Sequence, residues 1–150
     1  MTYVPLWCKS NFSFLEGASH PEELMEQAHA FGLRSLALTD RDGVYGMVRA
    51  HVRAQELGIH LIVGTEATIG GLVGSCTCVL LAMNRTGYAN LCRLITSGRL
   101  RRPKGESSIT WDELCDRAEG VIALWRGLPG RSTGDGRKAG TPQPVAARMR

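Results

Sequence analysis

The sequence predicts an α/β fold in which parallel strands are joined by crossover helices, and three observations lead to this. Short apolar runs of strand length alternate with amphipathic helical patterns along residues 1–125. Hydrophobic residues make up 43% and charged residues 21% of the 150 residues, which is ordinary for a globular domain. Apolar runs near the roughly 20 residues needed to cross a bilayer are missing, so we expect no membrane partner and a cytoplasmic protein.

The first half of the chain gives two strand–helix units. Residues 3–7 are expected to form a short strand, and Ser19 and Glu22 form a capping-box pattern with Pro21 in the first turn. The helix that follows should end at Gly32, with an inner face made of Leu24, Ala28 and Phe31. Strands are then predicted at 33–40 and 59–66, on either side of a helix at 44–57. That helix should end at Gly58 and have Val44, Met47, Val48, His51 and Val52 on its inner side.

The second half should continue the pattern. Gly70 and Gly71 are better interpreted as a hairpin turn than as a phosphate cradle, and a strand follows at 77–83. Tyr88, Leu91, Leu94 and Ile95 mark a third helix. Thr110 and Glu113 form a second capping box that opens a short helix ending at Ala118, and 121–125 is the last strand.

Residues 126–150 differ in character, because they are rich in Gly, Pro and Arg and have no period. We predict a disordered tail, since such a segment cannot bury enough apolar surface to offset its ordering entropy. Six of its side chains are basic and one is acidic, so the body at 1–125 is close to neutral despite the net charge of +4. A basic body would have indicated nucleic-acid binding, and this body does not.

Two carboxylates follow buried runs and mark the candidate site. Asp40 and Glu66 each come just after an apolar strand, and the carboxyl ends of parallel strands meet at one end of a sheet. Two structural interpretations stay open beside this one: Asp40 could cap the following turn, and Glu66 could be a strand-end residue at the surface.

Three stretches carry a family resemblance: WCKSNFSFLEGASHPEELMEQAHAFGLRSLALTDRDGVYGMVRA (7–50), LIVGTEATI (61–69) and LLAMNRTGYANLCRLIT (80–96). They resemble the opening of the PHP (polymerase and histidinol phosphatase) domain of bacterial DNA polymerases of the polymerase III alpha-subunit type, and most closely the error-prone, damage-tolerance paralogue. The resemblance implies part of a distorted seven-stranded (β/α) barrel. It also implies an origin in a DNA-directed DNA polymerase (a nucleotidyltransferase) of replication, repair and translesion synthesis.

The residues at the family's metal-ligand positions depart from its pattern. Where the family has His-x-His, this chain has Trp7 and Lys9, and where it has Thr-Asp-His-Asp, this chain has Thr39, Asp40, Arg41 and Asp42. Thr77 stands at a further histidine position, Glu16 where an aspartate is usual, and Glu66 keeps the acid of the third motif. Ammonium and guanidinium groups repel a dication, so we expect no metal and no phosphoesterase activity. We expect Lys9 and Arg41 to act as internal counter-ions for buried carboxylates instead.

Other candidate residues give weaker indications of a functional site. The four histidines, His20, His29, His51 and His60, share no metal-ligand spacing and are expected to be structural or exposed. The run from Arg99 to Lys104 could touch a phosphate backbone, although a solvated loop after a helix fits it better. The five scattered cysteines do not form a disulfide pattern.

Three functions stay open at this point. The resemblance implies a structural, inactive PHP segment that packs against a polymerase body, with the catalytic magnesium ions and the DNA contacts further along the polymerase chain. A free-standing PHP-type metal-dependent phosphoesterase is the alternative, and a non-catalytic binding module is the third. The abrupt change of composition after residue 125 predicts a truncated or frameshifted product.

Overall fold

The computed structural model describes residues 3–71 and 74–125. The expected tail at 126–150 lies outside the described residues. Eight elements follow in the order α1 (Pro21–Ala30), β1 (Ser35–Leu38), α2 (Met47–Leu57), β2 (His60–Gly71), β3 (Gly74–Ala82), α3 (Arg85–Leu100), α4 (Trp111–Asp116) and β4 (Val121–Leu124). No helix in this part of the chain is both long and apolar enough to span a bilayer.

The four strands form one mixed sheet in the order β1-β2-β3-β4. The α/β class is confirmed, and β1 and β2 are parallel neighbours joined through α2. The predicted parallel pairing is found for β1 and β2, whereas β2–β3 and β3–β4 are antiparallel, so the sheet is mixed. The predicted hairpin is confirmed, but Gly70 and Gly71 lie in β2 rather than in its turn, since they pair with Ser75 and Gly74 of β3. A tight turn reverses the chain, and so the two strands that it joins must be antiparallel.

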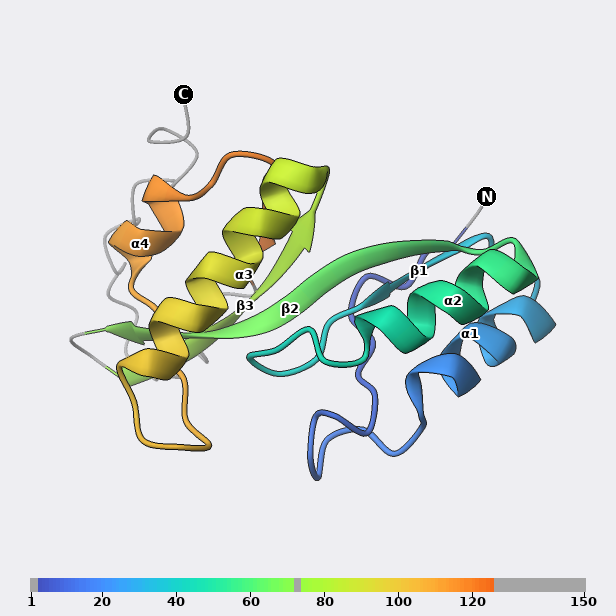
Figure 1. The fold of residues 1–150 in the computed structure, drawn as a ribbon, viewed down its shortest axis with the longest axis horizontal. Helices are drawn as coiled ribbons and strands as arrows, with labels where there is room; N and C mark the ends of the chain where they lie inside the picture. Colours follow the sequence, from blue (N-terminus) through green and yellow to red (C-terminus); the bar gives the residue numbers. More distant parts are fainter. Residues whose placement is uncertain (1–2, 72–73, 126–150) are drawn as a thin grey trace, which may run out of the picture.

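Strand β2 is the longest strand and joins two hydrophobic cores (Figure 1). Helices α1 and α2 pack on its first half and on β1, around Met25, Leu38 and Ala50. Helices α3 and α4 pack on its second half and on β3, around Ile69, Leu80 and Leu91. The middle of β2, near Glu66, therefore lies where the two halves of the molecule meet.

Several predicted boundaries and faces are corrected. Residues 3–7 form no strand, although Pro5 accepts a hydrogen bond from the Ala37 N–H (2.9 Å) and Cys8 forms an isolated bridge with Leu38. The first helix is capped by His20, whose backbone N–H donates to Glu23 (2.7 Å), so the capping box lies one residue later than Ser19 and Glu22. The second capping box, Thr110 with Glu113, is confirmed.

The inner faces of α1 and α2 differ most from the prediction. Phe31, Val48 and Val52 are 75%, 76% and 52% exposed, and His51 is exposed as well. The buried residues of α2 are Met47, Ala50 and Ala54. The alanines have no bulk to separate two helices, so α1 and α2 approach closely there and the valines are turned away from the core. Gly32 and Gly58, predicted as helix stops, both have the left-handed φ that follows a helix end, +68° and +69°.

Candidate ion-pair site

Backbone pairing brings the loop after β1 against the middle of β2. Beyond the regular β1–β2 ladder, Arg41 forms a parallel bridge with Glu66. The Glu66 N–H donates to the Asp40 carbonyl (3.0 Å), and the Asp42 N–H donates to the Glu66 carbonyl (2.9 Å). The convergence that we predicted for Asp40 and Glu66 therefore takes the form of a backbone pairing. Glu66 itself lies inside β2 rather than after it, because the strand runs on to Gly71.

Glu66 is a buried carboxylate surrounded by donors. It is 3% exposed, so the interpretation of a surface residue is wrong. Its oxygens lie 2.5 Å from Lys9 Nζ, 3.6 Å from Arg41 Nη2 and 3.1 Å from Trp7 Nε1. Burial alone would raise the pKa of Glu66, but the hydrogen bonds from Lys9, Thr77 and Trp7 and the charge of Arg41 more than offset it. The pKa of Glu66 is therefore below its ordinary value, and the side chain is ionised at neutral pH.

Glu16 completes the arrangement from the loop before α1. It contacts Lys9 and lies 2.8 Å from Arg41 Nη2, and these two cations lower its pKa. Lys9, Glu16, Arg41 and Glu66 thus form one ion-pair network of two cations and two anions. The members come from four separate segments of the chain, so the network crosslinks them.

A cavity of about 710 Å³ opens over this network. Five of the predicted site residues line it: Trp7, Lys9, Arg41, Glu66 and Thr77. Its remaining lining is mostly apolar and includes Leu6, Val79, Leu124 and Trp125. The Lys9 ammonium also lies 5.6 Å from the centre of the Trp7 ring, in cation–π range.

Asp40 belongs to a different set of contacts. Its side chain is fully buried and accepts three hydrogen bonds: from the Ser10 N–H (2.7 Å), the Ser10 hydroxyl (2.7 Å) and the Ser13 hydroxyl (2.6 Å). All three donors come from the segment before α1, so the interpretation of Asp40 as a cap for the following turn is wrong. The partners Ser10 and Ser13 were missed from the sequence, although serines in the quoted stretch at 7–50 were the available signal.

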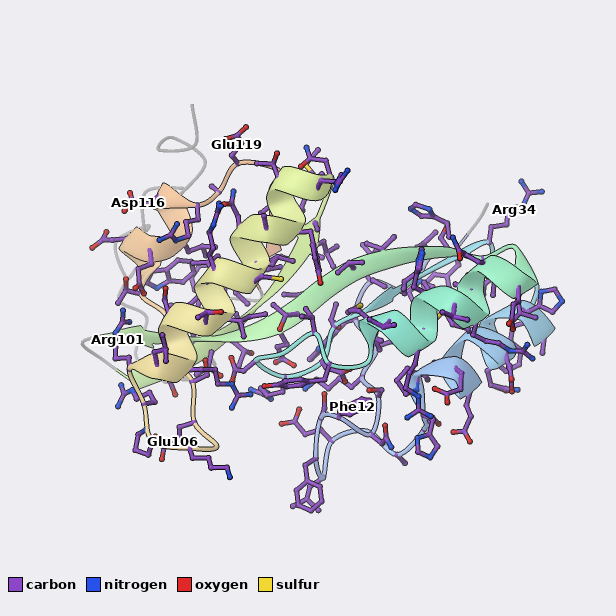
Figure 2. The ribbon with its side chains drawn as sticks, viewed as in Figure 1. Phe12, Arg34, Arg101, Glu106, Asp116 and Glu119 are labelled. Carbon is purple, nitrogen blue, oxygen red and sulfur yellow. The ribbon has the colours of Figure 1, made fainter. Side chains whose placement is uncertain are left out.

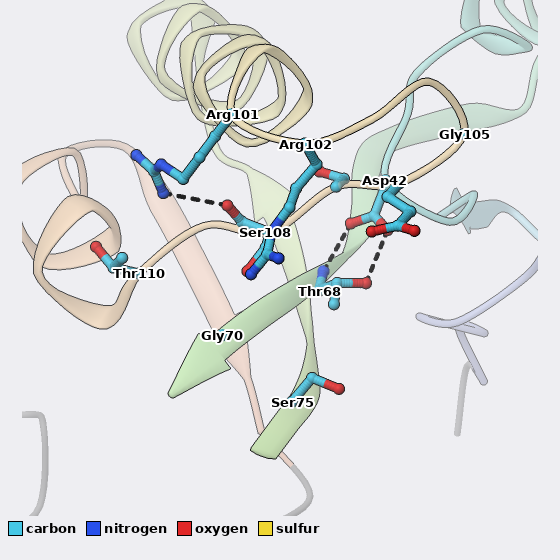
Figure 3. A pocket seen from close by; sticks show the side chains of 11 residues that line it. Asp42, Thr68, Gly70, Ser75, Arg101, Arg102, Gly105, Ser108 and Thr110 are labelled. Carbon is cyan, nitrogen blue, oxygen red and sulfur yellow. Dashed lines mark hydrogen bonds between the residues drawn. The ribbon is translucent and has the colours of Figure 1, made fainter. Parts of the chain in front are cut away.

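Asp42 lines a second cavity of about 720 Å³, where its carboxylate lies against Thr68 (Figure 3). It has a left-handed φ of +48°, and its carboxylate accepts from the Thr68 N–H (2.6 Å) and hydroxyl (2.7 Å). The Arg99 guanidinium donates to its carbonyl (3.0 Å). From the predicted basic run, Arg101 pairs with Glu113 and donates to the Ser108 carbonyl (3.2 Å), so two of these cations serve internal contacts.

The donor chemistry of the site is not that of a metal centre. Within residues 3–71 and 74–125, no group of three or more His, Cys, Asp or Glu side chains could hold a metal ion. The four histidines are exposed, as expected. Lysine and arginine nitrogens lie against both glutamates of the site, where a dication would need access to their oxygens.

Comparison with known proteins agrees with this fold. The PHP domain family matches residues 6–140, a range that includes the start of the segment expected to be a tail. Error-prone DNA polymerases are similar over their N-terminal region. The one from Ralstonia nicotianae is 49% identical over 129 residues, covering 85% of this chain and 12% of the relative. The one from Rhodopirellula baltica is 42% identical over 123 residues, covering 82% and 10%.

Solved structures give the same result. A protein of Bifidobacterium adolescentis, described provisionally as a metal-dependent phosphoesterase, matches with a TM-score of 0.50 and 28% identity, over 66% of this chain and 35% of that one. A two-domain PHP-like protein of Bacteroides vulgatus matches with a TM-score of 0.55 at 18% identity, over 81% and 34%, and this shows the fold alone. The chain spans about 12% of the length of these curated relatives. With these matches and the geometry above, the chain belongs to the PHP domain family.

Proposed function

We propose that this chain is the N-terminal PHP segment of an error-prone DNA polymerase and that its role there is structural. The family implies template-directed, damage-tolerant DNA synthesis in the cytoplasm, with DNA and the rest of the polymerase as partners. The similarity to error-prone polymerases over 85% of the chain supports the assignment. The polymerising carboxylates and their magnesium ions would belong to the other parts of the longer relatives, so this segment alone would not polymerise.

The observation that carries the structural role is the ion-pair network. In the family a metal cluster would be held by imidazoles and carboxylates, and the residues present here do not fit such a cluster. Lys9 and Arg41 lie against Glu16 and Glu66, which neutralises the carboxylates without any metal. The network would connect the same segments that a metal would connect, while providing no position for an activated water.

Metal analysis tests this proposal against the phosphoesterase alternative. The full chain is loaded with Zn²⁺ or Mn²⁺, dialysed and analysed by mass spectrometry, and its thermal melt is recorded with and without chelator. We expect less than about 0.1 metal per chain and an unchanged melting temperature, because binding that favours the folded state would raise it. Stoichiometric metal together with a chelator-sensitive melt would contradict the proposal and favour the phosphoesterase.

A variant extends the test in the other direction. Lys9→His with Arg41→His places imidazoles at two of the motif positions that the family uses for ligands. If the cations have replaced the metal, this double variant should bind more Zn²⁺ than the unmodified chain. His29→Ala, at an exposed helix position, is the matched control and should leave the Zn²⁺ content unchanged.

A further inference from the structure

The loop at residues 11–17, between the N-terminal segment and α1, has a fixed backbone. The Asn11 N–H donates to the Ser19 carbonyl (2.8 Å) and the Gly17 N–H to the Ser13 carbonyl (3.0 Å), which closes the loop on itself. A Cβ at Gly17 would lie 2.2 Å from the Ser10 carbonyl oxygen, so only glycine permits this close approach.

The same loop is anchored in the interior. Ser13 is 1% exposed, and its hydroxyl donates to the buried Asp40 (2.6 Å) and accepts from the Arg41 N–H (3.0 Å). Loops normally have few buried contacts and move freely. This one is held by a buried carboxylate next to the ion-pair network, so its outer residues are presented in a defined position.

Those outer residues are large and apolar. Phe14 and Leu15 are 84% and 89% exposed, and Leu15 has a left-handed φ of +63°, which residues other than glycine rarely adopt. Phe12 in the same loop is 41% exposed and packs against Tyr45, with ring centres 6.3 Å apart. The loop and its side chains extend away from both helical layers, with Phe12 at its base (Figure 2). An anchored loop with an unfavourable backbone conformation that presents apolar side chains to water is typical of a contact site.

The chemistry of the loop favours a protein partner. Residues 10–20 contain no Lys or Arg. The cations beside the loop are already paired, Lys9 and Arg41 with Glu16, and Arg49 pairs with Glu22. An anionic lipid surface and a nucleic acid would both require cations here. The match covers only 12% of the length of the Ralstonia nicotianae polymerase, so most of that protein is available as a partner for this segment.

We propose that Phe14 and Leu15 insert into an apolar groove on the polymerase body of an error-prone polymerase. This inference rests on the proposed function and names the surface by which the segment would support that body. Phe14 and Leu15 would be the central anchors, and Phe12 with Tyr45 would form the rim.

Oxidative footprinting tests the contact directly. The isolated chain is compared with a chimaera in which it replaces the matching 129-residue region of the Ralstonia nicotianae polymerase. We expect hydroxyl-radical oxidation of Phe14 and Leu15 to fall by about five-fold or more in the chimaera, since anchors of an interface are desolvated. Phe14→Ser with Leu15→Ser should lower the melting temperature of the chimaera and leave that of the isolated chain unchanged. Val48→Ser, at a position 76% exposed on α2, is the matched control.

The outcomes separate the two proposals. Equal oxidation of Phe14 and Leu15 in both proteins, with other residues of the segment protected, would overturn this inference and leave the structural role intact. If no residue of the segment is protected, both proposals fail. Protection that appears in the isolated chain as its concentration rises would assign the loop to a second copy and would also overturn the inference.

Discussion

Replacing Lys9 with methionine removes one charge from the ion-pair network and keeps an unbranched side chain of similar length. Lys9 and Glu66 are only 15% and 3% exposed, so their interaction is weakly screened by solvent. Removing one partner of a buried ion pair costs about 3–5 kcal/mol, because the remaining charge is left without compensation. Glu66 keeps Trp7 Nε1 at 3.1 Å and Arg41 at 3.6 Å. We therefore expect the free energy of unfolding to fall by about 2–3 kcal/mol at pH 7.

The loss should depend on pH in a defined direction. The folded-state pKa of Glu66 is lowered, so its ionised form stabilises the unmodified chain above about pH 4.3, and this contribution is lost as the pH falls further. In Lys9→Met, burial is opposed by fewer donors, so the pKa of Glu66 rises and protonation becomes favourable to folding. The difference in stability between the two proteins should therefore be largest at neutral pH and shrink as the solution becomes acidic.

Urea titrations at several pH values measure this difference. Lys9→Met combined with Glu66→Gln should recover much of the loss, because the buried charge is then absent. Arg49→Met is the control for a surface pair: Arg49 and Glu22 are 48% and 31% exposed, and we expect a change within about 0.5 kcal/mol. A Lys9→Met protein that unfolds at the same urea concentration as the unmodified chain would refute the counter-ion argument.

Three further predictions concern other contacts. Asp40→Ala should lower the free energy of unfolding by about 3–5 kcal/mol in the same titrations, because three buried donors lose their acceptor; a loss below about 1 kcal/mol would contradict this. Gly87→Ala should lower the melting temperature, since its Cβ would lie 1.9 Å from the Gly120 carbonyl oxygen, and an unchanged melting temperature would contradict this close approach. Glu113 has a pKa of about 2, lowered first by Arg101. The ionised Glu113 side chain stabilises the fold above about pH 4.3, and this contribution is lost as the pH falls toward 2. In Glu113→Gln, the melting temperature should therefore depend less on pH across that interval.

Sequence patterns predicted the elements better than their faces. Capping residues and terminal glycines act locally, and so Thr110 with Glu113 and Gly58 marked helix ends correctly. The inner faces of α1 and α2 depend on how closely two helices approach, and this is a tertiary property. Hydrophobicity favoured Val48 and Val52 as inner residues, whereas the close contact required Ala50 and Ala54 there.

The candidate site shows a similar division. The swap of ligand for cation at Lys9 and Arg41 was visible in the sequence, and the structure brings both to Glu66. The sequence predicted counter-ions for buried carboxylates, but it did not say which carboxylate each cation would meet. The hydroxyls of Ser10 and Ser13 donate to Asp40. These contacts are distant in sequence and depend on how the loop at 11–17 folds back, so the sequence pattern did not show them.

On the proposed function, the position of the network gives a reason for cations at the family's ligand positions. Glu66 lies in the middle of β2 and belongs to neither hydrophobic core, and its backbone is fixed by pairing with residues 40–42. The carboxylate is only 3% exposed, so it needs a positive partner whether or not a reaction takes place. In the family, a metal ion held by histidines would provide the positive charge, and in this chain Lys9 and Arg41 provide it. Exchange of the histidines for neutral residues would leave Glu66 uncompensated, so we infer that loss of metal chemistry and gain of these cations are coupled through Glu66.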